Sequence, residues 1–270
     1  LGKGLLKLAR SLCFVKGENG AYYDVSQRKP LQSLEDYFDD TKTGFEKTGI
    51  IAEALKNQRN IHRTSKEAIK EDYFETEDVK VRLKQYNYAE NLQRRLLRRF
   101  GRNRKGEDLC AAIEHELSKF SGKFSCVING DLAISNLLED GTVIDFEKAS
   151  IGNPVIDAVS TLEDPKNGRI AAENLFIQHY ASGADEEERI FLEESYRPHA
   201  TFISVCQTGS KFAQAQKKRQ EGRIHTAEND IERAKGFIRK VIETGKPKIK
   251  DKFVDYLRSS EEARELVDVL

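Results

Sequence analysis

Two aspartates and an asparagine in the middle of the chain have the types and spacing that phosphoryl transfer uses. A short apolar strand precedes Asp131, and Asn136 lies five residues later. A turn at Asp140-Gly141 then leads into a second apolar strand over 142–144, which ends on Asp145. In transfer from a magnesium nucleotide, one carboxylate orients the attacking hydroxyl and accepts its proton, while carboxylate and amide oxygens hold Mg²⁺. The three side chains therefore indicate phosphoryl transfer.

The same stretch resembles the catalytic and metal loops of a known superfamily. The matching segments are Asn129-Gly-Asp131 with Asn136, Ile144-Asp145-Phe-Glu, and Gly152-Asn-Pro with Asp157. They are similar to H-G-D-x-x-x-x-N, I-D-[FW]-[GE] and G-[DN]-P-x-x-D of the aminoglycoside phosphotransferase and choline kinase superfamily. The resemblance implies a protein-kinase-like fold. It also implies an ATP-dependent phosphotransferase that moves the γ-phosphoryl group to a hydroxyl of a small molecule.

The resemblance also gives each matching residue an expected role. Asp131 corresponds to the catalytic base, and Asn136 and Asp145 correspond to the Mg²⁺ ligands. Asp157 corresponds to a buried aspartate that braces the catalytic loop, and Asn129 supports the same loop structurally. ATP and Mg²⁺ are therefore the implied cofactors.

The chain departs from the family pattern in three respects. Asn129 stands where histidine is usual. Nine residues separate Asn136 from Asp145, which is a few fewer than usual. Either the hairpin is clipped or the sequence lacks residues, as its lack of methionine also indicates. Finally, there is neither G-x-G-x-x-G nor a V-A-I-K-like strand, so we expect the nucleotide-binding lysine upstream of Leu1.

The elements that must position these residues indicate an α+β chain dominated by helices. We expect mostly the large helical lobe of a protein-kinase-like fold, with a central β-hairpin catalytic core and a remnant of the small β lobe. Residues 1–30 would be the end of the small lobe and the hinge, with Tyr23 and Val25 near the adenine. Residues 31–270 would form the large, mainly helical catalytic and substrate lobe.

Local patterns place the individual elements. An Asn-Gly turn at 19–20 between apolar stretches predicts a hairpin over 13–25. Apolar spacing predicts helices over 45–62, 78–100 and 107–120, with a weakly patterned polar segment over 63–77. A short helix would open at Ser33, a β-rich stretch would cover 124–146, and Ser259 with Glu262 would cap a last helix. From residue 155 onward we expect helices, with breaks at Gly168, Gly183, Pro198, Gly222, Gly245 and Pro247.

Composition excludes several classes of protein. Forty-five basic residues balance forty-five acidic ones, so charge does not support chain-wide binding of nucleic acid. No apolar run approaches the roughly 18 residues that span a bilayer, and no signal peptide opens the chain. The four cysteines, Cys13, Cys110, Cys126 and Cys206, form no C-x-x-C pair. We interpret them as reduced thiols of a cytoplasmic protein without a membrane partner.

Other interpretations remain open beside the kinase. The main alternative is a catalytically inactive kinase-like binding or regulatory module, because Asn129 and the short hairpin depart from the pattern. A protein kinase is disfavoured because no A-P-E-like segment follows Asp145. The basic run 94–105 could bind a polyanion, although a solvated helix face is the favoured interpretation. The acidic run 185–188 could meet a cationic substrate, but acids also favour a first helical turn. No motif identifies the acceptor or the oligomeric state.

Overall fold

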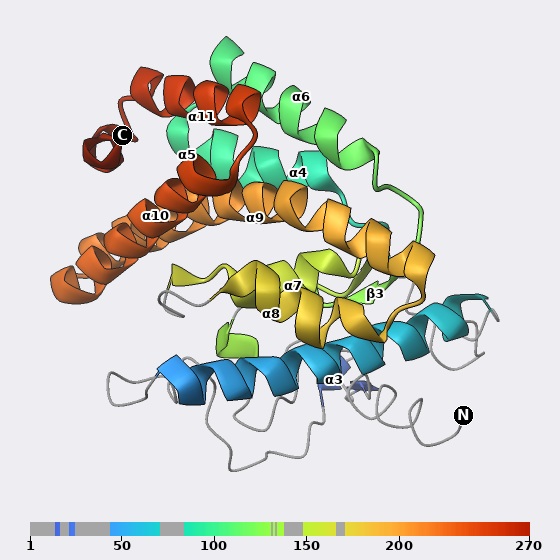
Figure 1. Cartoon of the computed structure of the whole chain (residues 1–270). Helices are drawn as coiled ribbons and strands as arrows, with labels where there is room; N and C mark the ends of the chain where they lie inside the picture. The colour runs from blue at the N-terminus through green and yellow to red at the C-terminus, as the bar shows by residue number, and fades with distance from the viewer. Residues whose placement is uncertain are drawn as a thin grey trace. The chain divides into compact units, whose positions relative to one another are not determined.

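The computed structural model describes residues 14–16, 22–24, 44–70, 84–130, 132, 134–137, 148–165 and 171–270 (Figure 1). The chain divides into two compact units. The first comprises Leu1–Gln85, Gly122–Thr161 and Arg169–Asp185, and the second comprises Tyr86–Ser121, Leu162–Gly168 and Glu186–Leu270.

The first unit contains two small antiparallel sheets. Strands β1 (Phe14–Lys16) and β2 (Tyr22–Asp24) pair with Val15 opposite Tyr23, which confirms the predicted N-terminal hairpin. Strand β3 (Cys126–Ile128) pairs with β4 (Ser150–Gly152), with Val127 opposite Ile151. The sequence did not predict β4, and the strand predicted over 142–144 lies outside the described residues.

A long helix, α3 (Gly44–Lys70), dominates the helical part of this unit. The helix predicted over 45–62 is confirmed, but α3 continues through 63–70, where the sequence predicted only a polar segment. Ile51, Ala54 and Leu55 are fully buried on its apolar side. The shorter helices are η2 (Ile134–Asn136), α7 (Val155–Leu162), α8 (Ala172–His179) and η4 (Ala181–Gly183), and α3 packs on α8 and β3 (Figure 1).

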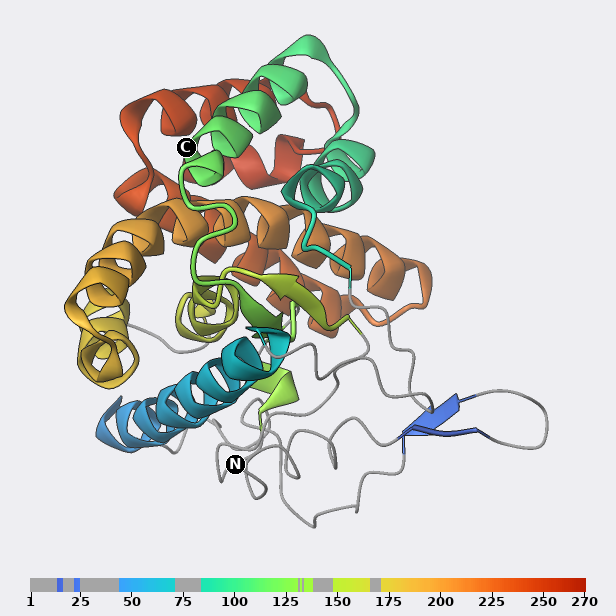
Figure 2. The same cartoon turned by 90° about the vertical axis from the view of Figure 1, so that its right-hand side faces the viewer.

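The described secondary-structure elements of the second unit are all helices. Its elements are α4 (Tyr88–Leu92), the π-helical turn η1 (Gln93–Leu97), α5 (Arg98–Phe100), α6 (Arg104–Ser118), α9 (Glu186–Gln220), α10 (Ile224–Thr244), α11 (Pro247–Ser259) and η5 (Arg264–Val269). The long helices α9 and α10 run side by side, joined by a turn at Gly222 with φ of 75° (Figures 1 and 2). Glycine suits that left-handed conformation because it has no Cβ. Helix α11 packs on α6.

Three expectations about helix ends were wrong. In the described part of the helix predicted over 78–100, residues 84–87 are not helical, and α4 begins at Tyr88, where the Asn87 side chain accepts a hydrogen bond from the Glu90 N–H. Pro198 lies inside α9 instead of ending it. Ser259 ends α11, and it is Ser260 that accepts a hydrogen bond from Ala263 N–H before η5.

Some expectations lie outside the described residues, namely the helix opening at Ser33 and the break at Gly168. The predicted division at residue 30 stays a prediction. Among the described helices, none is long and apolar enough to cross a bilayer.

Candidate functional site

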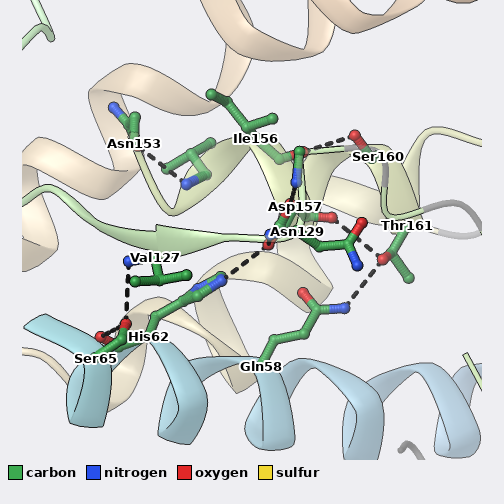
Figure 3. A network of polar contacts seen from close by, with 12 residues as sticks. Gln58, His62, Ser65, Val127, Asn129, Asn153, Ile156, Asp157, Ser160 and Thr161 are labelled. Carbon is green, nitrogen blue, oxygen red and sulfur yellow. Dashed lines mark hydrogen bonds and ion pairs between the residues drawn. The ribbon is translucent and has the colours of Figure 1, made fainter. Parts of the chain in front are cut away.

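A buried carboxylate of α7 holds the segment after β3. Asp157, in the first turn of α7, is 2% exposed. Its Oδ2 accepts a hydrogen bond from Asn129 N–H at 2.7 Å, and its Oδ1 accepts one from Gly130 N–H at 3.0 Å (Figure 3). Gly130 has φ of 76°, a left-handed conformation that glycine adopts without the steric cost of a Cβ. The backbone immediately before Asp131 is thereby fixed to α7.

Hydrogen bonds at the start of α7 and along it support the helix turn that carries Asp157. Asn153 Oδ1 accepts a hydrogen bond from Val155 N–H at 3.0 Å, so the asparagine caps the start of the helix. Farther along, Thr161 Oγ1 donates to the Asp157 carbonyl at 3.2 Å, and Ser160 Oγ donates to the Ile156 carbonyl at 2.7 Å (Figure 3). The Gly-Asn-Pro-x-x-Asp segment is thus a helix start that places Asp157 in the first turn of α7.

A buried histidine of α3 contacts the same carboxylate. His62 is 3% exposed, and its Nε2 lies 3.1 Å from Asp157 Oδ2. On the other side of the ring, Nδ1 lies 2.5 Å from the hydroxyl of Tyr180. An imidazole with its proton on Nε2 satisfies both contacts, donating to the carboxylate and accepting from the phenol. Asp157 therefore accepts three hydrogen bonds from two separate segments.

His62 belongs to a polar stripe that runs along one side of α3. Gln58 Nε2 donates to Thr161 Oγ1 at 3.0 Å, and Ser65 Oγ accepts from the Val127 N–H at 3.1 Å (Figure 3). Residues 58, 62 and 65 are spaced by four and three, so they share a helix face. The stripe continues the apolar side of α3 and attaches the helix to both α7 and β3.

The structure places the predicted site residues as follows. Asn129 and Asp157 come together through the hydrogen bond described above. Asn136 ends η2 and is half-buried, with Ile134 and Leu137 fully buried on either side. Tyr23 lies in β2. Asp131, Asp145 and Val25 lie outside the described residues.

His62 and Tyr180 are the residues that sequence reasoning missed. The sequence patterns assigned neither residue a part in the site. One signal was present, because His62 falls seven residues after Leu55 on the buried side of a predicted helix. Nothing in the chain order links residues 62, 157 and 180.

The second unit contains a buried histidine of a different kind. His199 Nδ1–H donates to the Ser195 carbonyl at 2.7 Å, and Nε2 accepts from the Tyr88 hydroxyl at 3.0 Å. Burial lowers the pKa of His199 to about 4 and raises the pKa of the Tyr88 hydroxyl. Both groups stay neutral near pH 7, so their part is structural.

Charged groups of the second unit are mostly paired or solvated. Buried Glu163 accepts from the Tyr196 hydroxyl at 2.5 Å and lies 3.0 Å from Lys240 Nζ. The basic run 94–105 is largely exposed, while Leu96 and Phe100 beside it are buried, as the solvated-face interpretation expects. Within the described part of the chain, no three His, Cys, Asp or Glu residues cluster as metal ligands.

Comparisons with known proteins show the family and the fold of this chain. The model of the phosphotransferase enzyme family matches residues 7–198. No curated protein matches the chain. Among solved structures, a choline/ethanolamine kinase family protein from Mesorhizobium loti is 13% identical, with a TM-score of 0.50 over 98% of this chain and 80% of that one. A Plasmodium vivax ethanolamine kinase is 15% identical, with a TM-score of 0.49 over 92% and 72%. The expected helix-rich, kinase-like α+β fold is confirmed.

Proposed function

Because the chain belongs to the phosphotransferase enzyme family, we propose that it is a magnesium-dependent kinase that transfers the γ-phosphoryl group of ATP to a hydroxyl of a small molecule. One observation supports this most directly: the buried Asp157 carboxylate accepts hydrogen bonds from both the Asn129 N–H and the Gly130 N–H. That pair fixes the backbone that leads into Asp131. A catalytic base has to be held to within a fraction of an ångström, and a backbone fixed by a buried carboxylate serves that need.

Each polar residue of the segment has a part in the proposal. Asp131 would orient the acceptor hydroxyl and take its proton as the phosphoryl group is transferred. Asn136 and Asp145 would hold Mg²⁺, and the donor set fits, since amide and carboxylate oxygens are hard ligands that suit this ion. When bound, Mg²⁺ neutralises charge on the phosphates. Asp157 and Asn129 would keep the loop in place.

The first test is binding of Mg²⁺·ATP, followed by thermal unfolding. A ligand that binds only the folded state stabilises it by about 2.7 kcal/mol at a hundred times its dissociation constant, which is a shift of several degrees in Tm. We expect a magnesium-dependent shift in the wild type and its loss in Asp145→Ala. No shift in either protein would favour the non-catalytic module instead.

The second test is turnover. Purified protein is incubated with Mg²⁺·ATP and pools of amino alcohols, aminoglycosides, sugars and nucleosides, and phosphorylated products are detected by ³¹P NMR. We expect Asp131→Ala to lower kcat by about 10²-fold or more while nucleotide binding persists. Asp140→Ala is the matched control, because the sequence assigns that carboxylate only to a turn. Equal turnover in Asp131→Ala and Asp140→Ala would contradict the assignment of the base.

The proposal includes a cytoplasmic location, where ATP and reducing conditions are found. Three of the four cysteines, Cys110, Cys126 and Cys206, are free and buried, which is compatible with a reducing compartment.

A further inference from the structure

We infer that exposed cations of the second unit form a surface that binds the phosphate backbone of nucleic acid. They come from α5, from the start of α6 and from the end of α11, and together they are called the cationic surface: Arg98, Arg99, Arg104, Lys105 and Arg258. The inference goes beyond the proposed kinase activity and does not depend on it.

The five side chains of the cationic surface are not engaged by acids. Other cations of this unit pair with carboxylates, as Arg219 does with Glu228 at 2.8 Å and Lys235 with Asp268 at 2.8 Å. Within the described part of the chain, no side chain of the cationic surface makes an ion pair or a hydrogen bond. Exposure alone is compatible with a solvated helix face, but five cations left without acids are available to an anion from outside.

The nearest acids reduce the positive charge without cancelling it. Glu107 is matched by Arg102, whose Nε lies 2.7 Å from its carboxylate. Three exposed acids remain near the cationic surface, and they carry three negative charges against five positive ones: Asp108, Asp255 and Glu262. The surface therefore keeps a net positive charge although the chain as a whole is neutral.

The turn between α5 and α6, which lies among these cations, is held by the end of α11. Helices α6 and α11 run side by side (Figure 1). The buried Tyr256 donates its hydroxyl proton to the Gly101 carbonyl at 2.7 Å, and Ser260 Oγ donates to the Phe100 carbonyl at 2.6 Å. The backbone that carries the cations is thus fixed before any anion binds, which lowers the entropy lost on binding.

One hydrogen bond brings the two parts of the cationic surface together. Asn103 Nδ2 donates to Ser259 Oγ at 3.3 Å. Arg104 follows Asn103 along the chain and Arg258 precedes Ser259, so the backbones of these two arginines are neighbours across the α6–α11 contact. A single strand of phosphates can therefore reach cations from both helices.

A surface pocket of about 450 Å³ lies at the end of α11 and gives a phosphate group a recess. Its lining includes two arginines and two acids. Arg264 pairs with Glu261 at 3.3 Å, and Asp268 pairs with Lys235. Arg258 is then the lining cation that makes no ion pair within the described residues, and it connects the pocket to the rest of the cationic surface.

The placement of these cations does not serve helix stability. The first turn of a helix is the positive end of its dipole, so cations are unfavourable there and acids are favourable. Helix α9 follows this rule with Glu186 and Glu187, whereas α6 begins with Arg104 and Lys105. A bound polyanion would relieve the repulsion between these cations, which gives their clustering a physical reason.

The chemistry of the surface favours phosphates over a membrane or an acidic protein. Four of its five cations are arginines, whose planar guanidinium can donate two N–H groups to one phosphate. Among the described residues, the exposed large hydrophobic side chains are Ile190 of α9 and Ile224 of α10, so this surface has no apolar anchor. Membrane and protein partners use such anchors. Binding to a phosphate backbone does not need one, because counterion release drives it.

Salt-dependent binding of the purified full chain tests the inference. The probes are a fluorescein-labelled 15-nucleotide oligothymidylate and a labelled 15-base-pair DNA duplex, followed by fluorescence anisotropy. For a single strand, each phosphate contact contributes about −0.7 to the slope of log affinity against log salt. With five contacts, affinity for the oligothymidylate should fall about 100-fold between 50 and 200 mM salt. Absence of saturable binding to both probes at 50 mM salt would overturn the inference.

A matched pair of double variants locates the contacts. Arg104→Gln/Lys105→Gln removes two charges of the cationic surface, and Arg239→Gln/Lys248→Gln removes two exposed charges elsewhere on α10 and α11. All four side chains are exposed, so both variants should keep the wild-type Tm. We expect the first variant to reduce the salt-dependent fall to about 20-fold and the second to keep it near 100-fold. Equal losses in the two variants would show that net charge and not this surface binds the strand.

Two more probes test the choice of partner. Phosphatidylserine vesicles and polyglutamate are compared with the oligothymidylate at equal concentrations of anionic groups and 50 mM salt. We expect the oligothymidylate to bind at least about tenfold more tightly than either. Equal or tighter binding to the vesicles would identify a membrane surface, and equal or tighter binding to polyglutamate an acidic protein segment. Either result would overturn the assignment to nucleic acid.

Discussion

Replacing Asp157 by asparagine offers a quantitative test of the loop arrangement. The carboxylate accepts from Asn129 N–H at 2.7 Å, from Gly130 N–H at 3.0 Å and from His62 Nε2 at 3.1 Å. An asparagine has one acceptor oxygen. Its NH₂ group must therefore face at least one of these N–H donors, and the lowest-cost orientation puts it opposite Gly130, where only one donor loses its acceptor.

The magnitude follows from that single mismatch. A hydrogen bond to a charged group contributes about 1.5–3 kcal/mol, and a buried donor left without an acceptor costs about 1–3 kcal/mol more. We therefore expect Asp157→Asn to lower the free energy of unfolding by about 3–5 kcal/mol. For a chain of this size each kcal/mol corresponds to about 2–4 °C, so Tm should fall by roughly 6–20 °C.

The assay is thermal and urea unfolding, followed by circular dichroism, of wild type, Asp157→Asn and Asp108→Asn. Asp108 is an exposed carboxylate of α6, so its replacement should change stability by no more than about 0.5 kcal/mol. If Asp157→Asn unfolds within about 1 kcal/mol of Asp108→Asn, the carboxylate does not hold the loop, and the reasoning about Asp157 fails.

Three further predictions concern two buried cysteines, a buried histidine and two helical glycines. Burial raises the pKa values of Cys110 and Cys206 to about 12, so neither thiol should react with Ellman's reagent at pH 8 until the protein is denatured, and rapid labelling of the native state would contradict this. Burial holds the pKa of His199 at about 4 against 6.5 for a free histidine, so its contribution is present above pH 6.5 and is lost as the pH falls from 6.5 to 4. Up to about 3 kcal/mol is involved, and His199→Gln should flatten the urea stability profile in that window, whereas a profile as steep as wild type would refute the assignment. Gly209→Ala would place a Cβ 1.8 Å from the Arg95 carbonyl oxygen and should lower the free energy of unfolding by about 3 kcal/mol or more. In Gly49→Ala of α3 the new Cβ meets nothing within 4 Å, so this variant should gain about 0.5–1 kcal/mol of stability. Urea midpoints measure both changes.

Local chemistry made several elements predictable. The Asn19-Gly20 pair predicted a hairpin, and β1 and β2 pair around it. The family resemblance of the Gly-Asn-Pro-x-x-Asp segment implied a buried aspartate, and Asp157 is buried in the first turn of α7, whose start Asn153 caps. The hairpin turn and the cap depend on contacts within a few residues, which turn and capping preferences express directly.

Other elements escaped sequence reasoning because distant contacts decide them. Residues 63–70 are polar, yet α3 continues there, with Ser65 accepting from Val127 N–H of β3. Pro198 usually ends a helix, but the residues around it, among them Tyr196, Ala200 and Phe202, are buried in α9. Burial of the surrounding side chains outweighs the loss of one backbone hydrogen bond, and a single sequence does not display that balance.

The sequence by itself determined the types and spacing of the oxygen-bearing side chains Asp131, Asn136 and Asp145, on which the proposed phosphoryl transfer depends. Only the tertiary structure decided what holds that segment. Along the chain, His62 lies 95 residues from Asp157 and 118 residues from Tyr180. The sequence gives the type of each side chain, but the packing of helices that are far apart in the chain decides which partner a buried side chain meets. This packing gives the buried His62 an acceptor in the Asp157 carboxylate and a donor in the Tyr180 hydroxyl.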